Sequence, residues 1–127
     1  MIPKIFIVED NLMYAAAIEH SLKDQDYEIK VFYNGQDLLD NLGQNPDIVS
    51  LDYMLPDMSG LEILQKITTF YPNVCTIVVS GQENVNVVVE AYKYGAKNYI
   101  VKNDNTVVEL RNAIKNAVDS IALKEEV

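Results

Sequence analysis

Five short apolar runs, rich in β-branched residues and separated by helical patterns, are the feature that most constrains the fold of this chain. Each run has the length of a β-strand. The runs are KIFIV (4–8), YEIKVF (27–32), DIVSL (47–51), CTIVVS (75–80) and NYIV (98–101). Regular alternation of strands with helices predicts an α/β protein whose parallel sheet is covered by helices on both faces.

Apolar residues at helical spacing lie between the runs. They recur every three or four positions in two segments, as Leu61, Leu64, Ile67 and Tyr71 and as Val107, Leu110, Ile114, Val118 and Ile121. Two S/T-x-x-E capping boxes predict helix starts, formed by Ser59 with Glu62 and by Thr106 with Glu109. Residues 84–94 contain three consecutive valines, which suit a strand as well as a helix, but the alternation favours a helix.

The five strand–helix units predict a doubly wound five-stranded parallel sheet with strand order 2-1-3-4-5, the flavodoxin-like (βα)5 topology. A length of 127 residues, 49% of them hydrophobic, suits one domain with one sizeable core. The chain shows no repeat, low-complexity tract or linker. We therefore expect residues 1–127 to form a single domain, with no output domain in this chain.

The charge balance argues against several classes of partner. Acidic residues number 19 and basic residues 10, and the net charge of −9 disfavours direct binding to nucleic acid or to an anionic membrane. No apolar run approaches the roughly 20 residues of a membrane span. The start, MIPKIFIVED, does not resemble a signal peptide, and the single Cys75 cannot form an internal disulfide. We therefore expect a cytoplasmic protein.

Polar residues gather at the carboxyl ends of four predicted strands. They are Glu9 and Asp10 after the first, Asp52 after the third, Ser80 at the end of the fourth and Lys102 after the fifth. In the order 2-1-3-4-5 these strands are neighbours, spaced by roughly 4.8 Å. The second strand, which would be outermost, ends without an ionisable residue. Three acids, a hydroxyl and a lysine are therefore expected to converge where such sheets bind ligands.

Three carboxylates at one edge need a counter-charge, because a pair about 4 Å apart repels by on the order of 4 kcal/mol. Mg²⁺ would supply it, since this ion prefers oxygen ligands, whereas the lack of nearby histidine or cysteine disfavours zinc. A carboxylate oxygen of Asp52 is then a candidate nucleophile for a phosphoryl group. Lys102, Ser80 and backbone N–H groups, which Gly81 would allow to approach closely, would neutralise the phosphoryl oxygens.

At these residues the chain resembles the receiver domain of two-component response regulators, the CheY-like family. The resemblance spans essentially the whole chain, so residues 1–127 would be one receiver domain. Its motifs are the pair Glu9-Asp10, Asp52 with Pro56 four residues on and Gly60 eight residues on, and then Ser80, Tyr99 and Lys102. Together, in this order and at the ends of the expected strands, they form a specific signature.

The resemblance implies a phosphoacceptor site. Asp52 would accept a phosphoryl group from a phosphohistidine on a partner, either a sensor histidine kinase or a phosphotransfer protein. Asp10, Asp52 and the backbone carbonyl of Met54 would ligate Mg²⁺, with Glu9 acting largely through water. The domain would catalyse only its own phosphorylation and dephosphorylation, so it would not be a turnover enzyme.

The resemblance also implies a conformational switch. Lys102 would pair with the phosphoryl group, Ser80 would move toward it, and the ring of Tyr99 would swing from outward to inward. The face formed by the fourth helix, fifth strand and fifth helix would report the change to a downstream target or output domain. The same face is the candidate surface for a homodimer. Met54 and Gln82 flank the site, where they would control the access of water to the acyl phosphate.

Three positions depart from the commonest pattern of the family. Glu9 stands where an aspartate is usual, and Ser80 stands where a threonine is usual. Asn103 follows Lys102 where the family usually has a proline, often after a cis peptide bond. Because a cis bond before another residue costs about 3 kcal/mol, we expect a trans peptide there, or a strained cis one, and an altered loop.

Other functions are compatible with parts of the sequence. A flavin-binding electron carrier would share the fold, but the loop EDNLM after the first strand would repel a phosphate group. A receiver-like interaction module that is never phosphorylated remains an alternative, because the usual proline is missing. His20 lies in HSLK and imitates the H-x-x-K pattern of all-helical phosphotransfer domains, but the five strand patterns favour a solvated helical histidine.

Overall fold

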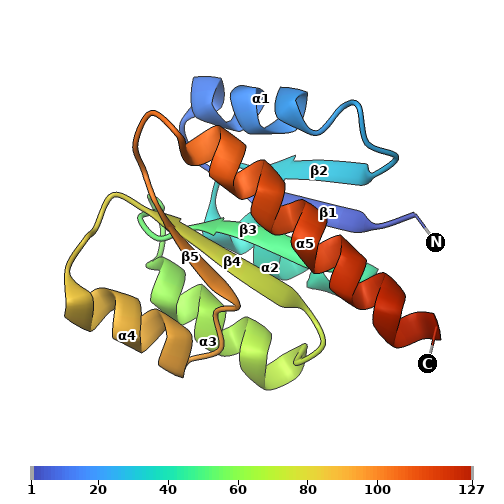
Figure 1. Ribbon diagram of the computed structural model, residues 1–127. Helices are drawn as coiled ribbons and strands as arrows, with labels where there is room; N and C mark the ends of the chain where they lie inside the picture. Colours follow the sequence, from blue (N-terminus) through green and yellow to red (C-terminus); the bar gives the residue numbers. More distant parts are fainter. Residues whose placement is uncertain (1, 127) are drawn as a thin grey trace.

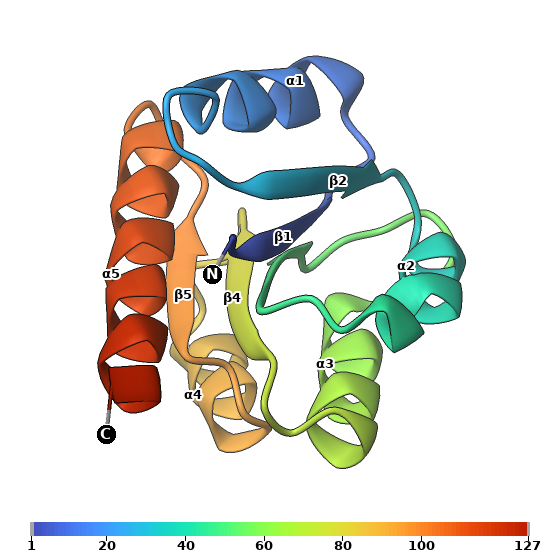
Figure 2. The ribbon, with the colours of Figure 1, turned by 90° about the vertical axis from the view of Figure 1, so that its right-hand side faces the viewer.

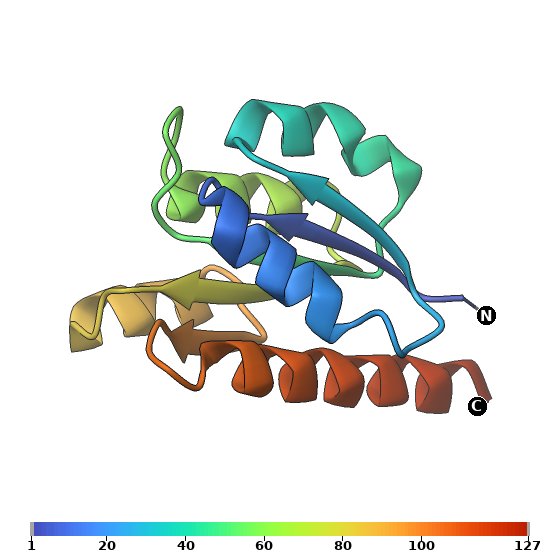
Figure 3. The ribbon, with the colours of Figure 1, turned by 90° about the horizontal axis from the view of Figure 1, so that it is seen from above.

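The computed structural model describes residues 2–126, which form a five-stranded sheet between two layers of helices (Figure 1). The strands are β1 (Lys4–Val8), β2 (Glu28–Phe32), β3 (Ile48–Asp52), β4 (Cys75–Ser80) and β5 (Asn98–Val101). Neighbouring strands pair in parallel in the order β2-β1-β3-β4-β5. The strand arrows therefore point toward one edge of the molecule (Figure 3). The predicted topology is confirmed.

The helices cover both faces of the sheet, as a doubly wound fold requires. On one face lie α1 (Leu12–Ser21) and α5 (Thr106–Glu126) (Figure 2). On the other lie α2 (Gly35–Asn41), α3 (Gly60–Phe70) and α4 (Val85–Lys93), and a 3-10 turn, η1 (Leu42–Gln44), follows α2. The segment with three valines is thus helical, as the alternation of elements predicts.

Alternate side chains of the central strands enter two hydrophobic cores, because successive residues of a strand point to opposite faces. In β1, Phe6 and Val8 pack in the core beneath α2 and α3. Ile5 and Ile7 pack in the core beneath α1 and α5. These four side chains are at most 1% exposed. The residue that follows β1, Glu9, is therefore held at the end of a tightly packed strand.

The two predicted capping boxes have different outcomes. The Ser59 side chain accepts a hydrogen bond from the Glu62 N–H (3.2 Å) and caps α3 as predicted. The box at Thr106 is wrong, because Thr106 is already the first residue of α5. Its buried hydroxyl instead accepts a hydrogen bond from the Asn103 N–H (2.6 Å) and lies 3.2 Å from the Val101 carbonyl oxygen. It therefore ties the start of α5 to the loop around Lys102.

The peptide bonds of the described residues are all trans, including the one that joins Lys102 to Asn103. This agrees with the first of the two alternatives expected from the missing proline. The Asn103 side chain accepts a hydrogen bond from the Asn105 N–H (2.7 Å), which closes the turn before α5. The loop after Lys102 is thus fixed by local hydrogen bonds to Asn103.

Candidate functional site

Two buried carboxylates and one lysine meet beyond the carboxyl ends of β1, β3 and β5. The Lys102 Nζ lies 2.9 Å from Glu9 Oε1 and 3.1 Å from Asp52 Oδ2. Glu9 is 2% exposed and Asp52 is 4% exposed, so both charges are taken out of water. The strand order brings together residues that are up to 93 positions apart in the sequence. This is the convergence that the sequence predicts.

Asp10 completes an acidic cluster with Glu9 and Asp52. Each of the three residues offers a carboxylate oxygen, and these oxygens all lie within 4.8 Å of one another. Unlike the other two, Asp10 is exposed. The donor set consists of carboxylate oxygens, which are ligands that Mg²⁺ prefers. The described residues therefore fit a hard divalent cation bound at the mouth of the site.

Burial and mutual proximity separate the acidities of the two buried acids. Burial, helped by the neighbouring Glu9, raises the pKa of Asp52 to about 7, against the opposing effect of Lys102. Burial also acts to raise the pKa of Glu9. Hydrogen bonds with Asp52, Lys102 and the Asn11 N–H outweigh that effect and lower it. The single positive charge of Lys102 does not balance the two carboxylates of Glu9 and Asp52. Of these two acids, Asp52 retains a proton more readily.

Tyr14 holds Lys102 from the side of α1. The Lys102 Nζ lies 5.0 Å from the centroid of the Tyr14 ring, within the range of a cation–π interaction. The Tyr14 side chain is half-buried and packs against the core beneath α1 and α5. Sequence reasoning missed this residue. The feature of the sequence that could have indicated Tyr14 is its place on the first turn of α1, four residues after Asp10.

The loop after Asp52 is anchored at both of its ends. The Met54 N–H donates to Asp52 Oδ1 (3.2 Å). Asp57 accepts hydrogen bonds from the Gly35 N–H (2.8 Å) and the Gln36 N–H (2.9 Å) at the start of α2. A Cβ added at Gly60 would lie 2.6 Å from the Tyr53 Cα, so the loop passes too close to α3 for a side chain. The sequence motif includes Gly60, but Asp57 was missed.

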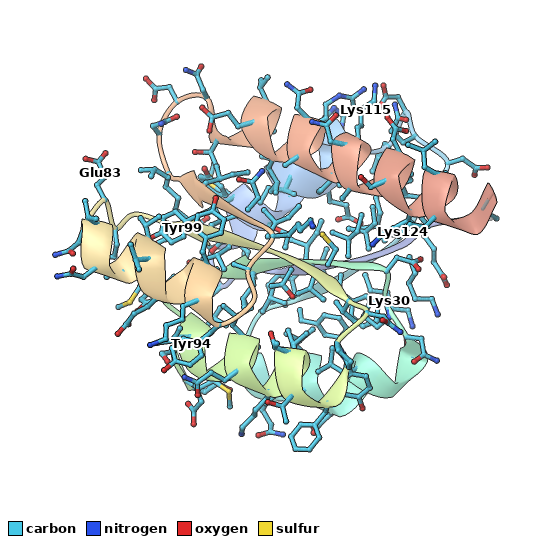
Figure 4. All side chains as sticks on the ribbon, turned by 60° about the horizontal axis from the view of Figure 1, so that its bottom comes forward. Lys30, Glu83, Tyr94, Tyr99, Lys115 and Lys124 are labelled. Atoms are coloured by element: carbon cyan, nitrogen blue, oxygen red, sulfur yellow. The ribbon has the colours of Figure 1, made fainter. Side chains whose placement is uncertain are left out.

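Ser80 and Tyr99 are linked through the backbone of Gln82. Ser80 is fully buried at the end of β4, and its Oγ accepts a hydrogen bond from the Gln82 N–H (2.9 Å). The half-buried Tyr99, on β5 beside α4 (Figure 4), donates its hydroxyl to the Gln82 carbonyl oxygen (2.8 Å). A displacement of Ser80 would therefore change the hydrogen bonds that hold Tyr99.

The sequence model of a protein family, the response regulator receiver domain, matches residues 5–115 of this chain. The match includes every residue of the cluster described above. The chain belongs to this family. Receiver domains are the signalling switches of two-component systems, and the fold, the acidic cluster and the lysine agree with that assignment.

Relatives of this receiver domain include a protein of similar length and a much longer one. It is 37% identical over 101 residues to the chemotaxis protein CheY of Listeria monocytogenes, covering 78% of this chain and 85% of that protein. It is 30% identical over 115 residues to the regulatory protein LuxO of Vibrio cholerae, covering 87% of this chain. The match spans only 25% of the length of LuxO.

A solved structure supports the same assignment. The signal receiver domain of a LuxO repressor protein from Vibrio parahaemolyticus superimposes with a TM-score of 0.91 and 25% sequence identity. The superposition covers 98% of this chain and 96% of that one.

Other residues singled out in the sequence lie outside the cluster. A Cβ added at Gly81 would meet no protein atom within 4 Å, so protein packing does not require glycine there, and the predicted approach of this backbone to a phosphoryl group stays a prediction. His20 is exposed on the last turn of α1, and the half-buried Cys75 starts β4 at the opposite end of the sheet. Among residues 2–126, none of the helices combines the length and the apolar character that crossing a membrane requires.

Proposed function

We propose that this receiver domain accepts a phosphoryl group on Asp52. The observation that carries the proposal is the environment of that carboxyl group, which is buried with Lys102 bound to one oxygen and the Met54 N–H bound to the other. A phosphohistidine of a sensor kinase or phosphotransfer protein is the proposed donor. Such an arrangement positions an activated nucleophile at the end of a rigid strand.

The proposed step transfers one phosphoryl group from the donor to Asp52. A carboxylate oxygen of Asp52 forms a bond to phosphorus while the bond from phosphorus to the donor's imidazole nitrogen breaks. The electron pair of the broken bond stays on that nitrogen, which takes up a proton, and the product is an acyl phosphate. Because the reaction needs the ionised carboxylate, the Lys102 ammonium favours it by opposing the raised pKa of Asp52.

Glu9, Asp10, Asp52 and the carbonyl of Met54 are the residues that would hold Mg²⁺. When bound, the ion would neutralise charge on the phosphoryl oxygens. Lys102 would bind a second phosphoryl oxygen, and the Ser80 hydroxyl with nearby backbone N–H groups would bind a third. Lys102 would have to exchange its carboxylate partners for the phosphoryl group, and the Tyr14 ring would remain beside it during that exchange.

The signal would leave the site through Ser80 and Tyr99. If Ser80 turns toward the phosphoryl group, its oxygen no longer accepts from the Gln82 N–H, and the Gln82 carbonyl that holds Tyr99 is displaced with it. The Tyr99 ring would then move inward, and the face of α4, β5 and α5 would present the change to a target, an output domain or a second copy. We further propose a cytoplasmic location and a receiver domain that spans residues 1–127.

The proposal is tested by intact-mass spectrometry after incubation with acetyl phosphate, with Mg²⁺ or with EDTA. The native chain should gain one phosphoryl group only with Mg²⁺, and Asp52→Asn should gain none. Asp26→Asn, which removes an exposed carboxylate elsewhere, is the matched control and should be labelled like the native chain. If the native chain is never labelled, the alternative stands, in which the domain works as an interaction module without phosphorylation.

A further inference from the structure

A hollow lies at the end of the sheet opposite the acidic cluster. It has a volume of about 420 Å³ and lies between the amino ends of β4 and β5 and the second half of α5. Cys75, the first residue of β4, and Asn98, the first residue of β5, are part of its wall. Cavities of about 300–1,000 Å³ are typical of small-molecule sites.

The hollow has a simple structural origin. α5 has 21 residues and β5 has 4, so a helix of about 32 Å lies along a strand of about 13 Å. The helix therefore extends past the strand that it covers. The positions of α5 that line the hollow include Ala113 and Ala117, whose small side chains leave the space unfilled.

The charged residues of the hollow are positive, although the protein as a whole carries a net charge of −9. Among the described residues of the wall, the charged ones are Lys97, from the loop before β5, and Lys124, from α5. Figure 4 shows Lys124 on the side of α5 that faces the sheet. Burial raises the pKa of the Cys75 thiol, and both ammonium groups oppose that rise. Cys75 and the two lysines line the same hollow.

The neutral polar groups of the wall suit an anion as well. The Asn98 side-chain oxygen already accepts from the Tyr99 N–H (2.9 Å), so the carboxamide has its donor end left for a ligand. Asn116 and Ser120 of α5 add a second carboxamide and a hydroxyl. Between these donors the wall is apolar, with Ile77 and Ile121 contributing alongside the alanines. The hollow thus combines hydrogen-bond donors and positive charge with an apolar floor.

We propose that this hollow binds a small organic anion with an apolar body. Lys97 and Lys124 bind its carboxylate, sulfonate or phosphate group, and the surface around Ala117 receives the apolar part. The proposal does not depend on the phosphorylation of Asp52, because the hollow lies at the amino ends of the strands and the acidic cluster at their carboxyl ends.

The test uses anilinonaphthalene sulfonate, an amphipathic anion that fluoresces when it leaves water, titrated against the native chain. Saturable binding at one site is expected. The double variant Lys97→Gln/Lys124→Gln should weaken it roughly tenfold, since charge-assisted hydrogen bonds are lost. Ala117→Leu should abolish it by filling the hollow. In nitrogen-15 NMR spectra the probe should shift the amide signals of residues 113–121.

The matched control is Lys23→Gln/Lys66→Gln, which removes the same charge from two exposed lysines away from the hollow. It should bind the probe like the native chain. Circular dichroism and the denaturation midpoint verify that each variant is folded, and Ser120→Leu is a second filling variant. The proposal is overturned if the native chain shows no saturable binding, if the filled variants bind normally, or if the control weakens binding as much as the test pair.

Discussion

The two ends of the sheet hold their charged residues in opposite ways. At the carboxyl end, Glu9 and Asp52 are buried and depend on one partly buried lysine, Lys102, for neutralisation. At the amino end, Lys97 and Lys124 are exposed around an open hollow and keep most of their hydration. Buried charges are costly unless they are paired, whereas exposed charges contribute little to stability. The charged residues at the carboxyl end should therefore affect the stability of the fold, whereas the lysines at the amino end should not.

Removing one lysine from each end should give the largest difference in stability between the two ends. Lys102→Met leaves two buried carboxyl groups without their cation and should lower the free energy of unfolding by about 3 kcal/mol in EDTA. Lys97→Met at the amino end should change it by less than about 0.5 kcal/mol. Urea denaturation of both variants measures the difference. Equal effects would show that the carboxyl end does not depend on its lysine.

A pair of glycine substitutions compares how tightly the two ends are packed. Gly60→Ala places a methyl group 2.6 Å from the Tyr53 backbone beside Asp52, and should destabilise the fold by about 2 kcal/mol. Gly43→Ala, near the amino end of β3, meets no atom within 4 Å and should cost nothing. Denaturation midpoints decide the comparison. Acetyl phosphate labelling should also slow in Gly60→Ala, because the loop that carries Met54 is displaced.

The change in the free energy of unfolding with pH should report the ionisation of Asp52. Its pKa is about 7 in the folded chain, above the ordinary value near 3.8, so the folded state binds more protons between these values. The free energy of unfolding in EDTA should therefore fall by on the order of 1–2 kcal/mol as the pH rises from 5.5 to 7.5. Glu9 does not produce this slope, because its pKa is lowered and its contribution is lost only at more acidic pH.

Denaturation of Asp52→Asn over the same pH range is the control. The variant should lose most of the slope, since an amide does not titrate. Saturating Mg²⁺ should flatten the slope in the native chain as well, because a cation that binds only the folded acidic cluster competes with the proton. A slope that survives in Asp52→Asn would assign the effect to other carboxyl groups.

The smallest expected effect concerns Tyr14. Tyr14→Leu removes the ring beside Lys102 and should cost about 0.5–1 kcal/mol, whereas Tyr14→Phe keeps the ring and should stay near the native value. The initial rate of labelling by acetyl phosphate should fall about twofold to fivefold in the leucine variant only. If the phenylalanine variant slows equally, the Tyr14 hydroxyl rather than the ring face is what matters.

The sequence predicts the architecture well because each of the five strand–helix units has its own apolar run. Each apolar run ends where a strand ends to within one residue, and the first run and the last two coincide with β1, β4 and β5. The valines of α4 were ambiguous by propensity alone, and their helical state follows from the connection that parallel strands require. The convergence of Glu9, Asp52 and Lys102 is predictable for the same reason, since strand order alone brings strand ends together.

Contacts that depend on side chains from other elements were not predictable. Tyr14 meets Lys102 because α1 lies across the sheet next to α5, a packing that no local pattern specifies. Asp57 binds the start of α2 through a loop whose path is irregular. Thr106 fits a capping box in sequence, but its hydroxyl is buried against the loop at Asn103. A threonine suits a helix cap and a buried hydrogen bond to a loop equally well, so the residue type does not distinguish the two.

The claim that Asp52 is the phosphoacceptor is tested most directly by finding which residue acetyl phosphate phosphorylates. After incubation with acetyl phosphate and Mg²⁺, borohydride reduction converts an aspartyl phosphate to homoserine, and peptide mass spectrometry locates the converted residue. Conversion at position 52, absent in EDTA and in Lys102→Met, is the predicted result. Conversion at Asp10 or at no acidic residue of the native chain would contradict the claim that the buried carboxyl group beside Lys102 is the phosphoacceptor.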